Sequence, residues 1–383
     1  MLFLPRRFAV TAHAMPRKKS SVWLRGLDLL ASVMAPPKKK ATRRKTAAVK
    51  ISTNATVKRA KRVSSTAGAP ASATPKSRSK APEKVLPGRW LRSFHSAPPT
   101  AGRLVNHLAY ALYLPETSAS TVNLPLVVML HGCKQTAESF ARGTRICQRA
   151  ERAGFAVLLP EQAKTAHAQG CWHWHDDPAN TEAPAVASLV EAIVGEYGFD
   201  AQRVYLAGIS AGAGLATALA IADPRLFAAI GLHSGPVFGA ATSTMTAMSV
   251  MRRGTRDNPV QLIDTRVDVN HYPGMPTVIV HGELDAVVTK RNAEQLTLQF
   301  ARLNRLVDAQ GELRVGEERF YSRDGADYID YVKGGRNVVR QCIVRGLGHA
   351  WSGGDPSEPF HSARGPDATA LLWNFFRRQR RIT

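Results

Sequence analysis

Ser210 stands midway between two glycines in the segment Gly208-Ile209-Ser210-Ala211-Gly212. This G-x-S-x-G spacing is typical of a serine nucleophile held on a sharp turn between a strand and a helix. The glycines leave room where a side chain would collide with the neighbouring strand and helix. The spacing therefore predicts attack by the Ser210 hydroxyl on an acyl group. It also makes the Ala211 backbone N–H one donor to the oxyanion that forms.

A serine hydroxyl needs a base, and the base needs an acid to orient it. After a nucleophile on this kind of turn, the acid and then the histidine follow later in the chain. Asp285 comes just after an apolar run, and His349 lies in a Gly-rich segment after the next one. We therefore predict a triad of Ser210, Asp285 and His349, with Glu283 as the competing carboxylate. The histidines that compete with His349 are His233, His281 and His361.

The second oxyanion donor is expected in the loop after an early strand. The residues His131-Gly132-Cys133 follow such an apolar run, and Gly132 lets the backbone approach a substrate closely. We assign the second donor to the backbone N–H of Cys133. The Cys133 side chain is either a small packed group or half of a disulfide with Cys171 that braces this loop.

The segment 170–177 contains two tryptophans and two histidines within four residues. In a loop above the site, Trp172 and Trp174 would form an apolar platform for an acyl or hydroxyacyl chain. Trp351, two residues after His349, is a third candidate for substrate contact. The alternative is that the tryptophans fill the core beneath the loop.

Metal and cofactor chemistry is not predicted. The histidines of segment 170–177 lack a third spaced ligand elsewhere, and the four cysteines form neither a CxxC pair nor a Cys/His cluster. No run of residues is long and apolar enough for a membrane-spanning helix.

Alternating short apolar runs and helix-like stretches begin near residue 103, which predicts a doubly wound, mostly parallel α/β sheet. Such a sheet gathers its functional loops at the carboxyl ends of its strands. The expected strands are 108–114, 124–130, 155–159, 203–207, 228–232, 277–280 and 338–344, and the expected helices are 137–153, 185–197 and 210–222.

Charge divides the chain into two parts. Residues 1–96 hold 23 of the 52 Lys and Arg residues but only two of the 29 acidic residues, Asp28 and Glu83. Residues 97–383 therefore hold 29 basic and 27 acidic residues and are nearly neutral. We predict a basic, largely disordered tail over 1–96 and a catalytic domain over 97–383.

The tail suggests a function of a different class. Its lysine and arginine runs, within residues 17–62, suit non-specific contact with a polyanion or a polymer-granule surface. No aromatic interleaving or nucleic-acid-reading module accompanies them, so sequence-specific recognition is not expected.

Six segments of the sequence carry a family resemblance: 126–135, 170–177, 203–216, 227–235, 278–285 and 346–354. Together they resemble the esterase family of polyhydroxybutyrate (PHB) depolymerases, in the α/β-hydrolase superfamily. The resemblance implies hydrolysis of esters in poly(3-hydroxyalkanoate) or 3-hydroxybutyrate oligomers through an acyl-enzyme, with Ser210, Asp285 and His349 on the triad positions. Feruloyl and acetylxylan esterases are similar to this family, so polysaccharide esters are the alternative substrates.

The cellular location stays open at this stage. The family resemblance implies an extracellular enzyme. The first residues, however, place arginines where a secretory signal needs an apolar run, so a cytoplasmic location is the alternative.

Overall fold

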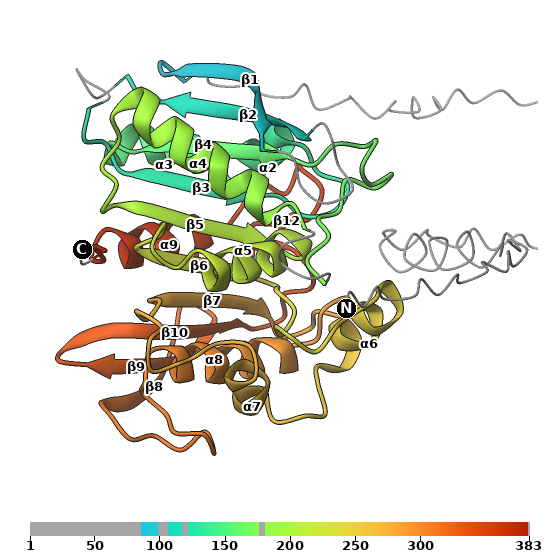
Figure 1. Cartoon of the computed structure of the whole chain (residues 1–383), viewed down its shortest axis with the longest axis vertical. Coiled ribbons are helices and arrows are strands. Elements are labelled where there is room, and N and C mark those ends of the chain that lie inside the picture. The colour runs from blue at the N-terminus through green and yellow to red at the C-terminus, as the bar shows by residue number, and fades with distance from the viewer. Residues whose placement is uncertain (1–85, 99–105, 117–121, 176–180, 382–383) are drawn as a thin grey trace, which may run out of the picture. The chain divides into compact units, whose positions relative to one another are not determined.

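The computed structural model describes residues 86–98, 106–116, 122–175 and 181–381 (Figure 1). The predicted contacts of residues 17–62, and nearly all of the predicted disordered tail, lie outside these ranges. Among the described residues, no helix combines the length and apolar character needed to cross a membrane.

Within the described residues, ten strands form one sheet in the order β1-β2-β4-β3-β5-β6-β7-β10-β9-β8 (Figure 1). The six from β4 to β10 are parallel, and antiparallel strands extend the sheet at both ends. The predicted doubly wound, mostly parallel sheet is therefore confirmed. The strands are β1 (Arg89–Ala97), β2 (Asn106–Leu114), β3 (Leu126–Leu130), β4 (Ala156–Glu161), β5 (Val204–Ile209), β6 (Ala229–His233), β7 (Thr277–Gly282), β8 (Glu317–Arg323), β9 (Ala326–Lys333) and β10 (Arg336–Val344).

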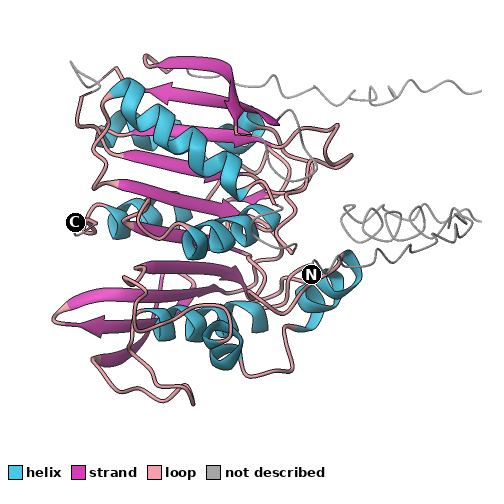
Figure 2. Ribbon diagram, viewed as in Figure 1, coloured by secondary structure: helices cyan, strands magenta, loops and turns pink. Residues whose placement is uncertain are grey.

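Helices cover both faces of the sheet (Figure 2). Along β3, Leu126, Val128 and Leu130 enter one apolar cluster, while Val127 and Met129 enter the other. This alternation is why the central strands read as continuous apolar runs. One face is covered by α4 (Ala183–Tyr197), α5 (Ala211–Ala222) and α8 (Arg291–Leu303), and the other by α2 (Ala137–Thr144), α3 (Ile146–Ala153) and α9 (Ala368–Phe376).

Smaller elements lie around the carboxyl edge of the sheet or beside its helices. Helix α6 packs on α8 near that edge, and helix α7 packs on α8 as well. A short parallel pair joins β11 to β12 and places Trp351 beside His361. The bounds of these elements are α6 (Thr244–Arg253), α7 (Pro259–Asp264), β11 (Trp351–Ser352) and β12 (His361–Ser362).

Two expectations from the sequence need correction. The single helix expected over 137–153 is two helices, because Arg145 adopts a left-handed conformation (φ 56°) and ends α2. All of strand β1 except Ala97 lies in the stretch assigned to the tail, and the strand pairs with β2 along its full length. The folded unit therefore begins before residue 97.

Candidate active site

The nucleophile candidate lies at the turn from β5 into α5. Ser210 has φ 56° and ψ −121°, a backbone conformation that a residue with a side chain rarely adopts. A side chain at Gly208 would collide with the first turn of α5, and one at Gly212 would collide with the Leu130 carbonyl at the end of β3. The two glycines therefore permit the close strand–helix crossing that presents Ser210 at the sheet edge.

The acid and base candidates are in direct contact. The Nδ1–H of His349 donates to Oδ2 of Asp285 at 2.7 Å. The other carboxylate oxygen, Oδ1, accepts the backbone N–H groups of Val287 and Val288, each at 2.9 Å. Burial alone would raise the pKa of Asp285, but nearby His349 and these hydrogen bonds hold it below its usual value. Asp285 is thus an oriented anion behind the imidazole.

Strand order explains why these three residues share one edge. Strands β5, β6, β7 and β10 are neighbours in the sheet and run parallel. Ser210 follows β5, Asp285 follows β7 and His349 follows β10. Between them, the carbonyl of His233 at the end of β6 accepts the Ser210 N–H at 2.9 Å.

The competing carboxylate and two of the competing histidines have other partners. Glu283 accepts the backbone N–H of Gly346 at 2.9 Å. Buried His233 stacks on Trp351 and accepts the Ser352 N–H. Buried His281 donates its Nε2–H to the Val288 carbonyl at 2.7 Å, and the same nitrogen lies 3.6 Å from Oδ2 of Asp285. His281 therefore packs beside Asp285 and supports its turn, while His349 makes the shorter contact with the carboxylate.

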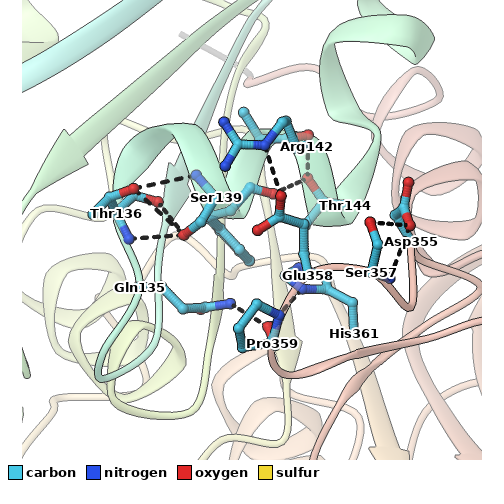
Figure 3. Close-up of polar contacts among 12 residues, drawn as sticks. Gln135, Thr136, Ser139, Arg142, Thr144, Asp355, Ser357, Glu358, Pro359 and His361 are labelled. Atoms are coloured by element: carbon cyan, nitrogen blue, oxygen red, sulfur yellow. Dashed lines mark hydrogen bonds and ion pairs between the residues drawn. The ribbon is translucent and has the colours of Figure 1, made fainter. Parts of the chain in front are cut away.

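The third competing histidine, His361, packs against α2 (Figure 3). Its Nδ1–H donates to the Pro359 carbonyl at 2.8 Å, and any side chain at Gly143 would collide with its ring. The loop that carries it is fastened to α2 by the ion pair of Arg142 with Glu358 at 2.7 Å. His361 therefore holds the loop against the helix.

The loop 131–135, called here the oxyanion loop, follows β3. The Gly132 N–H donates to Oε1 of Gln135 at 2.8 Å, and the Lys134 N–H donates to the Gln169 carbonyl at 2.7 Å. Among the described residues, the N–H groups of Cys133 and Ala211 have no acceptor. Two free backbone donors, one from each side, suit an oxyanion site.

A disulfide joins Cys133 to Cys171, with the two Cα atoms 4.4 Å apart. The oxyanion loop is thereby linked covalently to the segment that carries Trp172 and Trp174. Of the two alternatives that the sequence leaves open for Cys133, the structure contains the disulfide.

Two of the three tryptophans proposed to contact substrate belong to the core. Trp172 is 1% exposed and donates its indole N–H to the His131 carbonyl, and Trp351 is fully buried against Phe140 and His233. Neither ring reaches the surface, which argues against the platform expected of Trp172 and against the substrate contact expected of Trp351. Trp174 is half-buried and rests on α5 at Gly214, one turn after Ser210.

The chain matches a known protein family over more than half of its length. The family model for esterase PHB depolymerases matches residues 108–323. The chain belongs to this family. The match begins in β2 and ends with β8, so it covers the turn of Ser210, the oxyanion loop and Asp285.

Relatives of this PHB depolymerase family member include enzymes named for different esters. Poly(3-hydroxyalkanoate) depolymerase C of Paucimonas lemoignei is 27% identical over 63% of this chain, and the match spans only 58% of the relative's length. Acetylxylan esterase A of Emericella nidulans is 27% identical over 51% of the chain and 67% of the relative. Feruloyl esterase B of Neurospora crassa is 29% identical over 50% of the chain and 68% of the relative.

A solved structure has the same fold. Acetyl xylan esterase from Aspergillus awamori superposes with a TM-score of 0.57 at 18% identity, covering 75% of this chain and 99% of that one. The α/β-hydrolase fold expected for the PHB depolymerase family is therefore present.

Sequence reasoning missed the polar groups that support the site of this family member. Gln135 and Gln162 each follow a buried strand by a few residues, and Glu182 precedes α4. All three are nearly buried and hydrogen-bonded. For Gln162, a polar residue directly after an apolar strand was the available signal, although it does not reveal which partner the side chain meets. No group of three or more His, Cys, Asp or Glu side chains in the described part of the chain is arranged to hold a metal ion.

The disulfide yields a prediction about stability. Cys133 and Cys171 are 38 residues apart, and a cross-link closing such a loop stabilises the folded state by about 4 kcal/mol through the unfolded chain. We expect Cys171→Ser to lower the free energy of unfolding by roughly that amount in denaturant titrations. Reduction of the wild-type protein should reproduce the loss, and an unchanged midpoint in both experiments would contradict a stabilising role.

Proposed function

We propose that this protein is a serine carboxylic-ester hydrolase with Ser210 as nucleophile, His349 as base and Asp285 as the acid that orients it. The observation that carries the proposal is the 2.7 Å contact of His349 with Asp285, which is buried and hydrogen-bonded. This pair lies at the same edge of the sheet as the strained turn that holds Ser210. Membership of an esterase family supports the same chemistry.

The proposed mechanism has two halves. His349 removes the Ser210 proton as the hydroxyl oxygen attacks the ester carbonyl, and the Cys133 and Ala211 N–H groups stabilise the tetrahedral oxyanion. Asp285 stabilises the imidazolium that forms. The alcohol leaves with the proton from His349, and water, activated by the same base, then hydrolyses the acyl-enzyme. The chain's own residues supply every group in this sequence, with no cofactor invoked.

For the substrate, we propose oligomers or polymers of 3-hydroxyalkanoates, with acetyl and feruloyl esters of polysaccharides as the alternative. The family model and the Paucimonas lemoignei relative support the first class, while the fungal relatives support the second. Half-buried Trp174 offers an apolar surface one helical turn from Ser210, which suits the methyl-bearing backbone of a hydroxyalkanoate.

The test is hydrolysis by the purified full chain of 3-hydroxybutyrate oligomers, p-nitrophenyl esters from C2 to C8, and a feruloyl ester. A higher kcat/KM for the 3-hydroxybutyrate oligomers than for the other esters would support the hydroxyalkanoate assignment. Reaction with acetyl or feruloyl esters alone would move the substrate to polysaccharide esters and keep the triad. Inertness toward every ester would overturn the proposal.

Trp174 provides a prediction about specificity. We expect Trp174→Ala to raise KM for C6–C8 esters about tenfold more than for the C2 ester, which corresponds to lost contact with roughly two CH₂ groups at about 0.8 kcal/mol each. Trp174→Phe, which keeps an apolar ring, should retain most of the preference. Steady-state kinetics across the ester series measure this. Equal changes for short and long chains in Trp174→Ala would exclude contact between Trp174 and the acyl chain.

A further inference from the structure

We infer that Glu182 is a positioning residue that holds the oxyanion loop in its active geometry. It lies at the start of α4 and touches none of the three triad residues, so it acts through other groups. The inference rests on the proposed function, because it assigns a role within that reaction.

Glu182 is a buried carboxylate, 4% exposed, that collects hydrogen bonds from two directions. Its Oε1 accepts from Nε2 of Gln162 and from Nδ1–H of His173, each at 2.7 Å, and its Oε2 accepts the His173 backbone N–H at 3.0 Å. Burial would raise its pKa, but these hydrogen bonds and the nearby imidazole lower the pKa to about 2. Glu182 is therefore an anion throughout the pH range in which an esterase works.

The first connection to the oxyanion loop runs through Gln162, which follows β4. Besides donating to Glu182, its side chain donates to the Cys171 carbonyl at 3.1 Å. Its backbone N–H donates to Nε2 of His131 at 3.1 Å, and Nδ1–H of the same ring donates to the Gly132 carbonyl at 2.8 Å. Glu182 thus holds Gln162, Gln162 holds the His131 ring, and that ring holds the peptide that joins Gly132 to Cys133.

The second connection runs through His173 and the disulfide. Glu182 holds both the ring and the backbone N–H of His173, two residues after Cys171. Cys171 is bonded to Cys133, whose N–H is the proposed oxyanion donor. Between them, Trp172 donates to the His131 carbonyl at 2.9 Å. Both connections therefore end within the segment 131–133 of the oxyanion loop, and both reach His131.

This arrangement predicts a catalytic effect rather than a binding effect. The oxyanion forms only after attack, so displacement of a donor weakens the transition state more than the bound ester. Loss of one oxyanion donor costs roughly 10²–10³ in kcat in serine hydrolases. A donor displaced but still present should cost less.

The test is Glu182→Gln in the full chain. The NH₂ group of the new glutamine would face N–H groups of Gln162 or His173, which now donate hydrogen bonds to the carboxylate. We expect kcat for p-nitrophenyl acetate to fall 10- to 100-fold while KM stays within about twofold. Affinity for a trifluoromethyl ketone, whose Ser210 adduct carries an oxyanion, should fall by a similar factor.

Asp330→Asn is the matched control, because Asp330 is also buried and accepts from a cationic partner, Arg340 at 2.7 Å, but lies on β9 away from the site. Asp330→Asn should lower the melting temperature without changing kcat. If Glu182→Gln fails to fold, Gln162→Met, which keeps the anion and removes one connection, should show the same split between kcat and KM.

Full kcat in a folded Glu182→Gln protein, or a rise in KM alone, would overturn the inference and leave the proposed function intact. A wild-type protein inert toward every ester, or one in which Ser210→Ala stays active, would overturn both.

Discussion

Ser210→Ala is expected to lower kcat for p-nitrophenyl acetate by roughly 10⁴- to 10⁶-fold, the range seen when a triad nucleophile is removed. The oxyanion donors and the base remain, but no group can form the acyl-enzyme. The fold should persist, because the Ser210 backbone contacts do not involve its hydroxyl. Steady-state rates measured beside the melting temperature separate loss of chemistry from loss of structure.

A serine far from the site supplies the matched control. Ser322 lies on the edge strand β8, where its hydroxyl donates to Asp327 at 2.6 Å. Ser322→Ala should leave kcat unchanged. More than a few per cent of the wild-type rate in Ser210→Ala would remove Ser210 from the nucleophile's role.

Asp285→Asn is expected to lower kcat by about 10⁴-fold, because an amide neither holds the imidazole in the required tautomer nor stabilises the imidazolium. KM should change little, since Asp285 is buried behind His349 and does not face the substrate. Kinetics at pH 8 with the C2 ester test this.

The carboxylate two residues earlier tests the assignment of the acid. In the described part of the chain, Glu283 accepts a hydrogen bond only from the Gly346 N–H, so Glu283→Gln should keep kcat within a few fold of the wild type. If Glu283→Gln were the inactive variant and Asp285→Asn the active one, the roles would have to be exchanged.

The parallel core was predictable because its strands are buried on both faces and therefore appear as uninterrupted apolar runs, such as 126–130. The Ser210 turn was predictable for a related reason. Steric crowding on both sides forces glycine at positions 208 and 212, and that requirement is visible as a fixed spacing.

Other features had no comparable signal. Strand β8 is exposed along nearly its whole length, so it lacks the alternation of apolar and polar residues that indicates a strand. A sequence does not indicate whether a tryptophan lines a pocket or fills a core. Only the packing in the structure distinguishes buried Trp172 from half-buried Trp174. The contacts of Glu182 join residues from three segments, and no spacing in the sequence encodes them.

Strand β1 changes how the basic N-terminal segment should be studied. Its residues Arg89–Ala97 pair with all of β2 and form the outer edge of the sheet. A chain shortened to begin at residue 97 would expose the unpaired backbone of β2, a template for intermolecular strand addition. Aggregation of such a protein would then be mistaken for a requirement for the basic residues. A chain that begins at Lys84, the first residue of the compact unit that contains β1, loses most of the net positive charge and keeps β2 paired at the sheet edge.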